Sequence, residues 1–172
     1  MKTRHLLRRF LEGIWKSFLE YLNPDSQRRL LEILSEEYIE KSENVIKFTD
    51  YAAHMTYPQF RENLLRIANE EQGDVRWLAK HITASGGEIP QISFSPRPGK
   101  NDWERLLMAL EKKKRHVSDR VDRFVQLQRI DPEIGEELRR MRHEEEIHRE
   151  QIQAMMMRSD PQAGWSSNGS LS

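Results

Sequence analysis

The chain has 172 residues, which suits one domain and leaves little room for a second. Lys plus Arg and Asp plus Glu number 28 each, so the formal net charge is zero. This balance argues against a nucleic-acid-binding protein, because such proteins normally carry a basic excess. The chain has no cysteine, which excludes disulfides, thiolate metal sites and cysteine nucleophiles.

Charged residues make up 33% of the chain and hydrophobic residues only 37%. This composition favours long amphipathic helices, each of which needs a single apolar stripe. No stretch approaches 18 uncharged apolar residues, so we expect no membrane-spanning helix. Arg8, Arg9 and Glu12 interrupt the apolar run that a signal peptide needs. We therefore expect an all-helical protein of the cytoplasm.

Prolines, glycines and capping residues divide the chain into helical segments. Helix starts are indicated by Asn23-Pro24, Tyr57-Pro58 and Asp131-Pro132, and by Asn101 with Glu104 in a capping-box-like pair. The predicted helices cover residues 1–22, 24–55, 58–84, 101–130 and 132–158. We interpret these as an amphipathic N-terminal helix (1–22), a helical bundle (24–158) and a polar tail expected to be disordered (159–172).

Within the four long helices, apolar residues follow alternating steps of four and three, which is the seam of a bundle helix. Polar residues interrupt two of these seams at the same place, Glu71 and Asp74 in one helix and Glu145 and His148 in the other. A shift of 74 residues maps one helix onto the other, so two helical hairpins repeat in pattern. The linker at 85–100 is long enough to be a crossover. The fold class predicted is all-α: a ferritin-like antiparallel four-helix bundle with one long crossover, plus the N-terminal helix.

The interrupted seams contain residues that can bind metal. Glu145 and His148 are three positions apart, so both project from one helix face. Carboxylate oxygen and imidazole nitrogen at this spacing suit iron or manganese, and a bundle core can supply the remaining ligands. Lys41 and Lys114 also occupy seam positions, where each can neutralise a carboxylate. The pattern leaves two interpretations open: a metal site and a metal-free network of buried ion pairs.

Three segments carry a resemblance to a known family. MRHEEEIHREQI at 141–152 resembles the fourth helix of the ferritin-like superfamily, in particular its rubrerythrin and bacterioferritin branch, with its Glu-x-x-His. IANEEQGDVRWLA at 67–79 resembles the second helix, with Asp74 where the family has His. Ala-Leu-Glu at 109–111 resembles the ligand position of the third helix. The resemblance covers about residues 30–158.

The resemblance implies a carboxylate-bridged site for two iron ions, or manganese, that reacts with oxygen or peroxide as a ferroxidase or peroxidase does. Carried over residue by residue, it places metal ligands at Glu37, Glu71, Asp74, Glu111, Glu145 and His148. The first-helix ligand is open: Glu37 lies 34 residues before Glu71, as Glu111 lies before Glu145, but counting through residues 57–71 favours Tyr38. The alternative function is that of a metal-free, degenerate ferritin-like bundle serving as a structural or interaction module.

The two ends of the chain give separate expectations about partners. The apolar face of residues 1–22 needs covering, so we expect a homodimer or larger oligomer, with peripheral membrane contact as the alternative use of this helix. Residues 159–172 either form a functionless terminus or act as a docking peptide. In the second case, Gly169-Ser170-Leu171 is similar to the motif with which cargo proteins dock into encapsulin shells.

Overall fold

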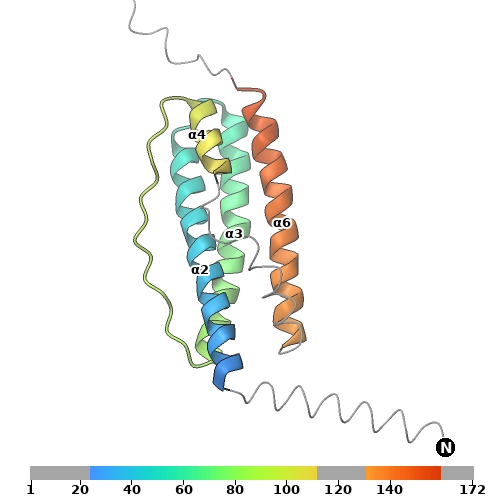
Figure 1. The fold of residues 1–172 in the computed structure, drawn as a ribbon. Coiled ribbons are helices and arrows are strands. Elements are labelled where there is room, and N and C mark those ends of the chain that lie inside the picture. The colour runs from blue at the N-terminus through green and yellow to red at the C-terminus, as the bar shows by residue number, and fades with distance from the viewer. Residues whose placement is uncertain (1–23, 112–130, 160–172) are drawn as a thin grey trace, which may run out of the picture.

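A computed structural model describes residues 24–111 and 131–159, and all regular secondary structure in this part of the chain is helical. The helices are α2 (Pro24–Ala53), α3 (Pro58–Ala84), α4 (Asp102–Leu110) and α6 (Pro132–Met156), shown in Figure 1. The predicted all-α class is thus confirmed for the described residues. The predicted helix at 1–22 and nearly all of the predicted tail lie outside them. No helix in the described part of the chain has both the length and the apolar character needed to cross a bilayer.

The helices begin where the capping residues predict. Pro24, Pro58 and Pro132 are the first residues of their helices, where the missing amide hydrogen costs nothing. The Asp131 carboxylate accepts hydrogen bonds from the amides of Glu133 and Ile134, both at 3.1 Å. These interactions satisfy amide groups that have no partner within the helix.

The helix predicted from Asn101 to about Ile130 is shorter than expected. Its start is confirmed, because the Asn101 side chain accepts a hydrogen bond from the Glu104 amide at 2.8 Å. Its last residue, however, is Leu110, and Glu111 has an extended backbone with φ −65° and ψ 114°. The Glu111 carboxylate pairs with Arg97 of the preceding connection. The rest of the predicted helix, residues 112–130, lies outside the described residues.

Residues 85–101 connect α3 to α4 and run back along the length of the helices without forming a helix or strand (Figure 1). Gly86 ends α3 with φ +78°, a left-handed conformation that glycine adopts without steric cost. The Tyr51 hydroxyl donates to the Arg97 carbonyl at 3.1 Å and ties the connection to α2. At the far end, the buried Asp102 carboxylate accepts from the amide of Thr56 at 2.9 Å. These bonds fix the start of α4 beside the turn between α2 and α3.

The apolar core consists of two clusters separated along the helices. One cluster joins α2, α3, α4 and α6 around residues such as Phe48, Leu64, Leu106 and Ile152. The other joins α2, α3 and α6, and its buried members are Leu30, Ile33, Leu34, Leu78, Ile82, Ile134, Leu138 and Met141. Between the clusters lie the buried polar residues of the interrupted seams. The two clusters therefore hold a polar layer in fixed register inside the helices.

Candidate functional site: a buried ion-pair layer

Lys41 occupies the centre of the polar layer. It projects from α2, is only 3% exposed, and places its Nζ atom 2.9 Å from Glu71 Oε1 and 3.0 Å from Asp74 Oδ2. Both carboxylates belong to α3 and are as deeply buried as the lysine. A buried carboxylate without a partner costs several kcal/mol, so this ammonium group supplies the charge that the two acids need. The expectation that Lys41 neutralises a carboxylate is confirmed.

The protonation states of Lys41 and Glu71 follow from their surroundings. Burial by itself would lower the pKa of Lys41, but Glu71 and Asp74 outweigh that effect and raise the pKa above its ordinary value. Burial would likewise raise the pKa of Glu71, but the hydrogen bond from His148 and the charge of Lys41 lower it. Asn44 adds a further donor to Glu71, from Nδ2 to Oε2 at 3.3 Å. Lys41 and Glu71 are therefore an ion pair and not a neutral acid and amine.

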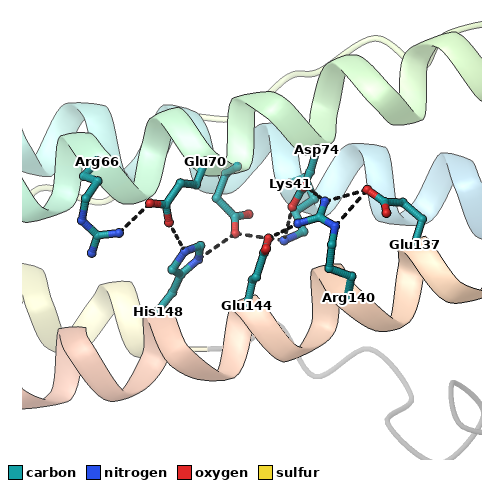
Figure 2. A network of polar contacts seen from close by, with 9 residues as sticks. Lys41, Arg66, Glu70, Asp74, Glu137, Arg140, Glu144 and His148 are labelled. Atoms are coloured by element: carbon teal, nitrogen blue, oxygen red, sulfur yellow. Dashed lines mark hydrogen bonds and ion pairs between the residues drawn. The ribbon is translucent and has the colours of Figure 1, made fainter.

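His148 of α6 lies between two carboxylates of α3, as Figure 2 shows. Its Nδ1 is 3.1 Å from Glu71 Oε1, and its Nε2 is 2.7 Å from Glu70 Oε2. Because an ionised carboxylate can only accept, both ring nitrogens must donate, which requires the doubly protonated imidazolium. Burial would lower the pKa of His148, but the bonds with Glu71 and Glu70 raise it above its ordinary value. In its protonated form His148 is a cation of this layer, with both ring nitrogens donating to acids.

Two arginines surround the buried pairs. Arg140 of α6 donates to Asp74 Oδ1 at 2.8 Å and to Glu137 at 2.7 Å, and it also pairs with Glu144 (Figure 2). Arg66 of α3 donates to Glu70 at 2.6 Å. These arginines satisfy the outward oxygens of the acids that hold Lys41 and His148, so the layer is continuous from the core to the surface.

The sequence interpretation missed these outer residues, although a signal for them exists. The shift of 74 residues that maps Glu71 onto Glu145 also maps Arg66 onto Arg140 and Glu70 onto Glu144. Each Arg–Glu pair lies four positions apart on its own helix and is ion-paired. Their positions had the pattern of solvated surface charges, because only the facing helix reveals that each pair extends a buried layer.

The structure brings together three of the six predicted metal ligands, Glu71, Asp74 and His148. Glu145 is half-buried on α6 and lines a cavity together with Glu71 and His148. Glu111 lines the same cavity but is exposed, and it pairs with Arg97.

The candidate for the first-helix ligand is not at this cavity. Glu37 is half-buried on α2 and does not line it. Tyr38, the alternative at that position, packs against the apolar cluster that contains Leu30 and Leu138. Of the six predicted ligands, Glu71, Glu111, Glu145 and His148 line this cavity.

The cavity beside the layer measures about 350 Å³. Its walls come from α2, α3, α4, α6 and the connection, and combine apolar residues such as Phe48, Met108 and Ile152 with charged residues such as Glu145 and Arg149. Glu71 and His148 of the ion-pair layer form part of its polar wall. This cavity is the space available for a ligand next to the buried charges.

Three features of the layer bear on whether a metal pair fits it. Within residues 24–111 and 131–159, no group of three or more His, Asp or Glu side chains has an arrangement that can hold a metal ion. Lys41 sits between the two best-placed carboxylates, and both nitrogens of His148 donate to acids. As they lie, the predicted ligands fit internal cations and do not fit two metal ions. The iron and manganese prediction stays a prediction.

No family model, no curated protein and no solved structure matches this chain. The ferritin-like assignment therefore stays a prediction based on the three motifs.

Proposed function

We propose that the chain is a ferritin-like four-helix bundle, with residues 85–101 as its long crossover, in which internal ion pairs replace the metal centre. We propose further that it acts as a non-catalytic structural or interaction module. One observation carries this proposal: the Lys41 ammonium lies 2.9 Å from Glu71 and 3.0 Å from Asp74, at a point enclosed by the helices. A permanent cation already supplies the positive charge that a metal would bring.

The residue at position 74 supports the same conclusion. The family that the chain resembles has His there, and a neutral imidazole would offer Lys41 no negative charge. Asp74 instead forms ion pairs with both Lys41 and Arg140. Asp74 and Lys41 are thus complementary departures from a metal site, since each supplies the charge that the other needs.

The three acids that contact Lys41 and His148 are matched by three cations without a metal. Lys41, Arg140 and the His148 imidazolium face Glu71, Asp74 and Glu70. An added divalent ion would have to displace one of these cations and would leave it buried without a partner. Stability without metal, and the absence of metal-dependent activity, follow from this balance.

The test is the response of the protein to iron. Protein purified from iron-supplemented cells should contain far less than one iron or manganese per chain. Ferrous ion added without oxygen should leave the Tm unchanged in the wild type, in Glu145→Ala and in the matched control Glu146→Ala, whose side chain is exposed on the same helix. The proposal fails if iron raises the Tm of the wild type and of Glu146→Ala but not of Glu145→Ala, and if ferrous oxidation accompanies it.

The iron protein remains a second candidate, and one observation favours it. Glu71, Glu145 and His148 line the same cavity, and two of them are one helical turn apart on α6. These three residues would hold the ion, which would supply chemistry with oxygen or peroxide. Their present hydrogen bonds to Lys41 and Glu70 would have to be given up, which is why the ion-pair module is preferred.

A further inference from the structure

The outward face formed by α3 and α6 contains a hollow of about 400 Å³. Glu70 and Gly73 of α3 line one side, and Arg140, Glu144 and Ile147 of α6 line the other. His148 lines both this hollow and the cavity described above, and Figure 2 shows the charged residues of this face between the two helices.

Equivalent residues of α3 and α6 line the hollow. The shift of 74 residues pairs Glu70 with Glu144 and Gly73 with Ile147, and all four residues line the hollow. Because α3 and α6 run in opposite directions (Figure 1), this shift corresponds to an approximate two-fold relation across the face. A surface that nearly maps onto itself is suited to an isologous contact, in which the same patch serves on both partners.

Gly73 and Ile147 occupy equivalent positions but differ greatly in side-chain size. Ile147 is 40% exposed. At the equivalent position, Gly73 has no side chain, and a Cβ atom added there would meet nothing within 4 Å. One helix therefore presents a bulky apolar side chain where the other leaves room for one.

The charges of the face allow two copies to approach. Arg66 and Arg140 balance Glu70 and Glu144, and each arginine is already paired with the acid of its own helix. A face of a single sign would repel its own copy, whereas this alternation does not.

The face is also large enough for a stable contact. With a rise of 1.5 Å per residue, helices of 27 and 25 residues are about 40 Å long. Two such helices side by side, each about 10 Å wide, together span a face about 20 Å wide, or roughly 800 Å². This is about the area per partner that a stable protein interface buries.

We propose that the α3–α6 face binds a second copy of this chain, with Ile147 of each copy entering the hollow beside Gly73 of the other. This inference rests on the proposed function only in that it names the partner of an interaction module. Its readout is the mass of the assembly, so its failure is distinguishable from that of the metal-free layer, which is read from the response of the Tm to iron.

The experiment is sedimentation velocity of the full chain over a range of concentrations. The wild type should be a dimer or an assembly of dimers. Ile147→Glu should lower the mass at least twofold, and Gly73→Gln, whose Cβ would meet nothing within 4 Å in its own chain, should do the same. Ile46→Glu is the matched control, because Ile46 is an isoleucine of α2 with similar exposure, 37%, and should keep the wild-type mass. Circular dichroism verifies that each variant is folded.

Cross-linking identifies the contact directly, because the chain has no cysteine of its own. Mixed Gly73→Cys and Ile147→Cys single variants should be joined by a short thiol-to-thiol reagent, and Ile46→Cys mixed with Gly73→Cys should not. A monomeric wild type overturns the proposal. So does an assembly that keeps its mass in both Ile147→Glu and Gly73→Gln, or one in which the Gly73–Ile147 cross-link does not form.

Discussion

Asp74 and His148 occupy equivalent positions in the two halves of the ion layer, yet they carry opposite charges. Asp74 is held by Lys41 and Arg140, which stay positive throughout the ordinary pH range. His148 is held by Glu71 and Glu70, and its own charge depends on a proton. One half of the layer therefore has a permanent charge balance, whereas the other half can be titrated.

The difference shows how a bundle core can keep a polar layer without a bound ion. The permanent cations Lys41 and Arg140 contact the most deeply buried acids, Glu71 and Asp74, whose isolation would be the most costly. The titratable half lies nearer the surface through Glu70, which is 44% exposed on its side chain, so loss of its charge is less severe. Four predictions test this contrast, beginning with the largest effect.

Lys41→Met should cause the largest loss of stability. The substitution keeps much of the side-chain length but leaves Glu71 and Asp74 buried without their shared cation, which costs about 3–5 kcal/mol. Chemical denaturation in metal-free buffer measures the change. Lys80→Met, an exposed lysine of α3, is the control and should change little. Equal losses in the two variants would mean that Lys41 has no special role.

His148→Gln should cost less, about 1.5–3 kcal/mol at pH 6, the range for hydrogen bonds that involve charged groups. Glutamine can still donate one bond to Glu71 or Glu70, but it brings no charge and cannot bridge both acids. His143→Gln, exposed on the same helix, is the matched control. A loss larger than that of Lys41→Met would reverse the ranking of the two halves.

The pH dependence of stability should come from the titratable half. The pKa of His148 is raised above its ordinary value of 6.5, so its contribution is complete below pH 6.5 and is lost as the pH rises through the folded-state pKa. The pKa values of Glu71 and Glu70 are lowered from their ordinary value of 4.5. Their contribution to stability is therefore present above pH 4.5 and is lost as the pH falls through their folded-state pKa values. The difference in unfolding free energy between the wild type and His148→Gln should thus be larger at pH 6 than at pH 9. A difference that grows with rising pH would contradict this assignment.

The two equivalent arginines should differ in a smaller but informative way. Arg66→Gln removes a half-exposed pair with Glu70 and should cost at most about 0.5–1 kcal/mol. Arg140→Gln removes a partner of the buried Asp74 and should cost more, about 1.5–3 kcal/mol, as expected for a hydrogen bond to a charged group. Thermal or chemical denaturation of both variants in parallel gives the comparison. Equal losses would mean that Asp74 is satisfied by Lys41 alone.

The sequence predicted the helix starts and the polar interruptions of the seams well, because both are local. Capping by Asn101 and Asp131, and the inward position of Glu71, follow from residue type and spacing within one helix. The pairing of His148 with Glu70 could not be predicted in this way. Helical periodicity states which face a residue occupies, but not which group the opposite helix places against it.

The end of α4 shows the same limit. Spacing continues the seam past Leu110, but the backbone becomes extended at Glu111, whose carboxylate pairs with Arg97 of the connection. Arg97 is 14 residues away in sequence, so no helix pattern includes it. Glu111, which the resemblance predicts as the third-helix ligand, thus lies at the end of α4 and pairs with the connection.

The central claim is that Lys41 takes the place of a metal between Glu71 and Asp74, and a double-mutant cycle tests it most directly. Lys41→Met, Glu71→Gln and the double variant are unfolded in metal-free buffer, and the coupling energy is obtained from the three changes in stability. The account predicts a coupling of about 2–3 kcal/mol, because Lys41→Met leaves the buried Glu71 carboxylate without this cation and the double variant removes that carboxylate. Additive losses, with a coupling near zero, would contradict it.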